Sequence, residues 1–202
     1  MDAFIAREKY IVKERKPGGI GVSVTKDEDV AKYESTRRKN VESYNTWLSI
    51  TIPDRSFFLD VAKPVREQTD DVIACIGKKE FLTTLFTSEA RRLYAGMDEL
   101  VSGETSSEAR LEKSNSIFAE FLAEKRDFVM AVPSGEELFA LICGRCREHD
   151  AGKSSALLYN AGIKGTLFSD ETGERILLYN AAKDIIVTGE RSGQLQEAAL
   201  TL

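Results

Sequence analysis

The chain has 202 residues, of which 42% are hydrophobic and 30% are charged, values that fit one ordinary globular domain. Its net charge of −5 argues against broad binding to nucleic acid, because that affinity comes from clustered Lys and Arg. The longest nearly uncharged stretch, near Phe128–Val132, is too short to span a bilayer, and residues 1–16 lack the apolar core of a secretion signal. The three cysteines, an odd number, fit a reducing compartment. We therefore expect a protein of the cytosol, either bacterial or of a host cell.

The first part of the chain alternates predicted strands and helices. Strands are predicted at Phe4–Val12, Gly19–Thr25 and Tyr44–Ile52, and a helix is predicted at Asp27–Asn40. Lys16–Gly19 is a Pro-Gly turn between the first two strands. Pro53 ends the third strand, and Pro64 suits the start of the next helix, whose apolar stripe includes Val65 and Ile76.

The middle of the chain is almost entirely helical in pattern from Lys78 to Lys125. A polar turn at Val101–Ser107 divides this region, and either Ser106 or Ser107 is suited to cap the helix that follows. Ser134 is the expected cap of a further helix.

Short strands are predicted again near the end of the chain. Gly162 should end a helix over Gly152–Ala161. The strands that follow are expected at Thr166–Phe168, Arg175–Tyr179 and Asp184–Val187. Strands at both ends and helices between them predict a single α+β domain over residues 1–189, with its sheet assembled from distant segments. A helical insert covers residues 78–132, and residues 190–202 form a tail.

Cys143, Cys146 and His149 have the spacing C-x-x-C-x-x-H, which invites a zinc interpretation. A closed zinc site needs four ligands, and no second pair follows at a suitable distance. The surrounding helical pattern instead favours the cysteines as small, half-buried side chains. No metal is predicted.

Several short motifs occur in an order that is informative as a whole. These are Gly19-Ile20-Gly21-Val22, Ala31-Lys32-Tyr33, Ile52-Pro53-Asp54, Leu59-Asp60, Lys63-Pro64, Glu67-Gln68, Gly135–Phe139, Ser155–Leu158 and Gly162–Gly165. In this order they resemble the polyvalent ADP-ribosyltransferase-like family of large phage and mobile-element proteins. The resemblance covers about Gly18–Val187. It implies an ADP-ribosyltransferase-like split β-sheet core, and NAD as the cofactor that such a site would bind.

The positions that bind and cleave NAD in this family are altered in this chain. Ile5 stands near the family's His, Ser23 replaces the first pocket tyrosine, Tyr33 retains the second, and Asn180 replaces the late-strand acid. Asn cannot carry the charge that stabilises a positively charged ribose. The cofactor-binding positions implied by the resemblance are Gly19, Gly21, Ser23, Thr25, Tyr33 and Asn180. The departures imply a degenerate member that has lost NAD-dependent catalysis and acts by binding a protein partner or a nucleotide signal, in a counter-defence or effector role.

The alternative is an active mono-ADP-ribosyltransferase. By similarity to other transferases of this fold, Arg7 would hold the diphosphate, Ser23 with Thr25 would orient the ribose, and Glu174 would supply the negative charge. Thr172-Gly173-Glu174-Arg175 does not have the usual Glu-x-Glu spacing. The competing interpretation is that Arg7 is a surface residue and Glu174 part of a hairpin turn.

Overall fold

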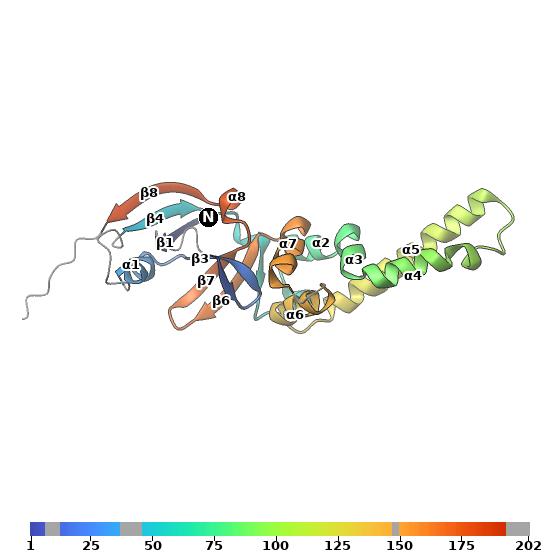
Figure 1. Cartoon of the computed structure of the whole chain (residues 1–202), viewed down its shortest axis with the longest axis horizontal. Coiled ribbons are helices and arrows are strands. Elements are labelled where there is room, and N and C mark those ends of the chain that lie inside the picture. Colours follow the sequence, from blue (N-terminus) through green and yellow to red (C-terminus); the bar gives the residue numbers. More distant parts are fainter. Residues whose placement is uncertain (7–12, 37–45, 147–149, 193–202) are drawn as a thin grey trace, which may run out of the picture.

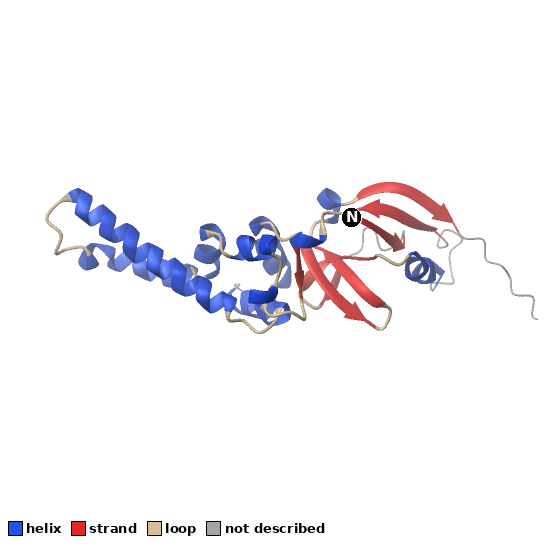
Figure 2. Ribbon diagram, turned by 180° about the vertical axis from the view of Figure 1, so that it is seen from behind, coloured by secondary structure: helices blue, strands red, loops and turns tan. Residues whose placement is uncertain are grey.

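The computed structural model describes residues 1–6, 13–36, 46–146 and 150–192. The molecule is elongated, with strands at one end, short helices in the middle and a long helical hairpin at the other end (Figure 1). The view from behind shows the same division between strands and helices (Figure 2). The predicted α+β class is confirmed. Within the described ranges, no helix has both the length and the apolar content needed to cross a lipid bilayer.

Most of the predicted helices and strands are present, with differences in their limits, and a few short elements occur that were not predicted. The strands are β1 (Asp2–Ala6), β2 (Glu14–Lys16), β3 (Gly19–Thr25), β4 (Thr46–Thr51), β5 (Phe58–Asp60), β6 (Gly165–Asp170), β7 (Gly173–Leu178) and β8 (Ile186–Ser192). The α-helices are α1 (Glu28–Thr36), α2 (Asp70–Ile76), α3 (Lys79–Leu85), α4 (Thr87–Leu100), α5 (Ser107–Met130), α6 (Gly135–Arg145), α7 (Ala151–Ala161) and α8 (Ala181–Asp184). Two short 3-10 helices are η2 (Arg55–Phe57) and η3 (Val65–Glu67).

A single mixed sheet joins strands from both ends of the chain. Its order is β5-β6-β7-β3-β1-β4-β8, with β2 paired to β3. The C-terminal strands β7 and β8 pair with β3 and β4, which confirms a sheet assembled from distant segments. Among the described residues, β1 and β4 share five registered pairs, whereas β1 and β3 share only the pair Phe4–Thr25. The sheet is therefore divided into two halves that meet at this pair.

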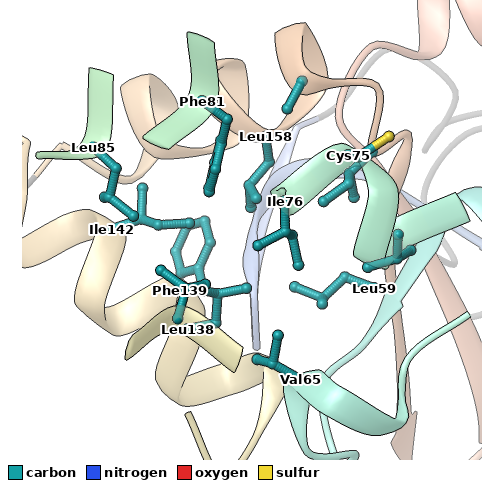
Figure 3. Close-up of a cluster of buried hydrophobic side chains, with 14 of the residues drawn as sticks. Leu59, Val65, Cys75, Ile76, Phe81, Leu85, Leu138, Phe139, Ile142 and Leu158 are labelled. Carbon is teal, nitrogen blue, oxygen red and sulfur yellow. The ribbon is translucent and has the colours of Figure 1, made fainter. Parts of the chain in front are cut away.

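Each face of the sheet buries its own apolar cluster. On one face, α2, α3, α6 and α7 pack around Leu59, Ile76 and Leu158 (Figure 3). On the other face, Ile5 of β1 and Ile176 of β7 belong to a second cluster that both halves of the sheet share. Burial of these side chains supplies most of the free energy that stabilises the fold.

Local capping chemistry places several helix ends where the sequence predicted them. Ser106 accepts a hydrogen bond from the Ala109 N–H, and Ser134 accepts one from the Glu137 N–H, each at 3.1 Å. Gly162 follows α7 with a φ of +118°, a left-handed conformation that favours glycine. These three predictions are confirmed.

The region around Pro64 differs from the prediction. Pro64 precedes the 3-10 helix η3, and α2 begins only at Asp70. The hydroxyl of Thr69 caps α2 by accepting a hydrogen bond from the Val72 N–H. The short 3-10 helix η3 therefore lies between Pro64 and the start of α2. Strand β5 was not predicted, because its three residues are too few to show an alternating pattern.

The limits of the outer strands also differ. β8 continues to Ser192, pairing Glu190 with Leu48 and Arg191 with Trp47, so the predicted tail at 190–202 begins later than expected. Residues 193–202 lie outside the described ranges. β1 is described only to Ala6, so the remainder of the predicted strand Phe4–Val12 is not described.

Candidate functional site

A buried arginine lies at the point where the two halves of the sheet meet. Arg175 of β7 is only 2% exposed, and its position pairs with Thr25 of β3. Its Nη2 donates to the Ser23 Oγ at 3.2 Å, and its Nη1 lies 3.4 Å from the Thr172 Oγ1. The carboxylate of Glu34 on α1 accepts from Nη1 at 2.8 Å and from Nη2 at 3.2 Å. We call Ser23, Glu34, Thr172 and Arg175 the Arg175 cluster.

The charges of the Arg175 cluster are largely compensated within the cluster itself. Glu34 binds the guanidinium with both oxygens, the two-point geometry that makes arginine–carboxylate pairs strong. The Nε of Arg175 is buried without a hydrogen-bond partner in the structure. The cluster is therefore a nearly neutral, enclosed ion pair that gives a substrate no free carboxylate.

Glu174 lies on the opposite face of β7. Neighbouring residues of a strand point to opposite faces, so Glu174 cannot share a face with Ser23 and Arg175. Its carboxylate accepts from both terminal nitrogens of Arg55, at 2.7 and 2.6 Å, and Lys26 lies 3.7 Å away. The hydrogen bonds from Arg55 lower the pKa of Glu174 below its ordinary value. Ser23 and Glu174, predicted to act together, are not brought together, and Arg7 lies outside the described residues.

The two glycines of the predicted cofactor motif serve close packing. A Cβ on Gly21 would lie 2.2 Å from the carbonyl oxygen of Leu178, and one on Gly19 would lie 2.5 Å from the ring of Tyr179. Both positions therefore require glycine for contact with the end of β7, independently of any ligand. The Gly-x-Gly spacing at residues 19 and 21 is therefore explained by packing against β7 and Tyr179.

Thr25 and Tyr33 differ strongly in burial. The Oγ1 of buried Thr25 accepts from the Asp27 N–H at 3.1 Å and so fixes the turn into α1. Tyr33 on α1 is 59% exposed. The implied pocket tyrosine therefore lies on the surface.

Asn180 lines a separate hollow of about 300 Å³, bordered by Ile20, Ser155, Tyr159 and Lys183. Ser155 Oγ accepts from the Ile20 N–H at 2.9 Å, which fixes the start of β3 against α7. Glu174 lines a different hollow, of about 270 Å³. Asn180, which stands at the family's acid position, and Glu174, the alternative acid, thus line different parts of the surface.

The cysteine motif shows no metal-binding arrangement in the part of the chain that the structure describes. Cys143 and Cys146 are half-buried, and Cys146 Sγ accepts from Ser154 Oγ at 3.6 Å. No group of three His, Cys, Asp or Glu side chains among the described residues is placed to hold a metal. His149 lies outside them.

Sequence reasoning did not identify Arg175 and Glu34 as partners. Arg175 directly precedes the apolar residues Ile176–Leu178 but follows Glu174 and a glycine, so the sequence alone did not mark it as buried. Once it is buried, its charge requires a partner. Nothing in the sequence identified that partner as Glu34, which is 141 positions away. Comparison with protein-family models, curated proteins and solved structures found no match for this chain.

Proposed function

We propose that this chain is an ADP-ribosyltransferase-like protein that does not transfer ADP-ribose and acts by binding a protein partner. The sheet built from both ends of the chain, with its halves joined at Phe4–Thr25, supports the likeness in architecture. The ordered motifs between Gly18 and Val187 support it in sequence.

The observation that carries the non-catalytic part of the proposal is the Arg175 cluster. Cleavage of NAD requires a negative charge beside the ribose, where positive charge develops as nicotinamide leaves. Beside Ser23 this chain instead places a guanidinium, and Glu34 is bound to it through both oxygens. Glu174 is held by Arg55 on the other face. These contacts support a fold in which the internal ion pair Arg175–Glu34 stands beside Ser23 in place of a free catalytic carboxylate.

The helical hairpin α4–α5 supports the partner-binding part. Ala90 and Val129 are the fully buried residues of its two helices. Tyr94, Leu100 and Leu111 are 54%, 49% and 63% exposed. Tyr is among the side chains that most often anchor protein interfaces, and Leu100 and Leu111 add exposed apolar area on the same hairpin. We call these three residues the arm surface.

The same hairpin is internally ordered, which favours recognition of a partner. The rings of Tyr94 and Phe118 lie 5.2 Å apart, and Phe118 stacks on Phe121 at 5.9 Å. An aromatic cluster that is ordered before binding lowers the entropy cost of association. The resemblance to phage and mobile-element proteins supports a host protein as the partner, in a counter-defence or effector role.

Site-specific photo-crosslinking in host cells tests the partner-binding part. A photoreactive amino acid at Tyr94 or Leu111 should give one discrete crosslinked product, whereas one at exposed Ile186 on β8 serves as the matched control. Replacing the other two arm-surface residues by Ser should remove that product without unfolding the chain. Equal crosslinking from Ile186, or a product that persists in the Ser variant, would exclude the arm surface as the interface.

A further inference from the structure

A polar hollow of about 630 Å³ lies at the base of the helical hairpin, between α3, the start of α4 and the end of α6. Its volume falls within the range typical of small-ligand sites. We call it the base pocket, and its polar lining consists mainly of Thr84, Ser88, Glu89, Arg91, Arg92 and Arg145. None of these residues belongs to the Arg175 cluster or to the arm surface.

One arginine of the base pocket is held in place. Arg145 Nη1 donates to Glu89 Oε1 at 2.7 Å, and its guanidinium carbon lies 4.3 Å from the ring centroid of Phe86. The hydrogen bond from Arg145 lowers the pKa of Glu89, so this carboxylate stays ionised. Packing on Phe86 and pairing with Glu89 fix the guanidinium before any ligand arrives.

The other two arginines have donors to spare. Among the described residues, Arg91 makes no hydrogen bond or ion pair, and Arg92 donates only through Nε, to the Ser88 carbonyl at 3.4 Å. Both side chains are exposed and line the same hollow. The pocket therefore offers several free N–H donors in the fork geometry that matches an oxyanion.

The charge of the lining indicates the kind of anion. Three guanidinium groups against the one carboxylate of Glu89 leave a local charge of +2, on a chain whose net charge is −5. A phosphate monoester carries about −1.5 to −2 at neutral pH, close to the charge needed to neutralise this lining. A single carboxylate would neutralise only half of it.

We propose that the base pocket binds a phosphate monoester, carried either by a small metabolite or by a phosphorylated side chain of a protein. Arg91 and Arg92 supply the direct contacts, and Arg145 supplies a fixed positive charge. The base pocket shares no residue with the arm surface, so phosphate binding can be measured on the purified chain, and its failure would leave the partner-binding proposal unaffected.

Calorimetry and arginine side-chain NMR with inorganic phosphate test this proposal on the full chain. Phosphate should bind saturably and shift the Nε resonances of Arg91 and Arg92. The double variant Arg91→Gln/Arg92→Gln should weaken binding about tenfold or more, because it removes two charge-assisted contacts. The variant Arg91→Lys/Arg92→Lys keeps both positive charges but loses the forked guanidinium geometry. Its affinity for phosphate should therefore lie between that of the unaltered chain and that of the double Gln variant.

The control is Arg110→Gln/Arg126→Gln, which removes the same charge from α5 outside the pocket and should leave the affinity within about twofold. Equal weakening in this control, or no shift at Arg91 and Arg92, would overturn the proposal. Ribose 5-phosphate and a phosphoserine peptide, with its unphosphorylated form as a blank, distinguish the sources. Tighter binding of either supports phosphate recognition and assigns its carrier.

Discussion

The proposed loss of catalysis depends mainly on one residue, Arg175. A charged side chain buried in a strand is expensive to desolvate unless a partner compensates it. Glu34, Ser23 and Thr172 supply that compensation from a helix, a strand and a turn. The guanidinium thereby links α1 to the pair β3–β7 beside Ser23.

Replacing Arg175 by Met should cost about 2 kcal/mol of unfolding free energy, because the half-buried Glu34 carboxylate then loses its charge-assisted hydrogen bonds to the guanidinium. Urea denaturation monitored by the fluorescence of Trp47 measures the loss. The control Arg15→Met removes an exposed arginine from β2 and should cost within about 0.5 kcal/mol. The double variant Arg175→Met/Glu34→Met should regain part of the loss. If Arg175→Met is as mild as the control, the cluster has no structural role.

At the level of the elements, alternating apolar residues and capping residues were sufficient to predict much of the fold. The strand Gly19–Thr25 was predicted with its observed limits, and Ser106, Ser134 and Gly162 mark helix ends as expected. β5 and the end of β8 were missed, because both are defined by pairing with distant strands rather than by their own sequence.

The cap of α5 gives a test of the hairpin as a locally stable unit. Ser106→Ala should remove about 1 kcal/mol of local stability from the first turn of α5. Amide hydrogen exchange there should become about five times faster, while exchange in β3 and β7 stays unchanged. Ser107→Ala is the matched control, since Ser107 is the first helical residue and not the cap. Faster exchange throughout the sheet would show that the hairpin and the sheet unfold together.

At the level of the whole molecule, the candidate site depends on the register between β3 and β7, which was not deduced from the sequence. The spacing of Ser23 and Glu174 was compatible with a shared site, yet β3–β7 pairing places them on opposite faces. A shift of one residue in that pairing would exchange the faces. Arg175 and Glu34, in contrast, meet only because α1 folds back over the junction between the two halves of the sheet.

NAD titration by calorimetry, with nicotinamide release measured on the same samples, is the most direct test of the non-catalytic function. Because Arg175 and Glu34 neutralise each other beside Ser23, we expect neither saturable binding nor nicotinamide release. Glu174→Gln should behave as the unaltered chain does. Saturable NAD binding with nicotinamide release that Glu174→Gln abolishes would contradict the proposal and establish an enzyme that cleaves NAD.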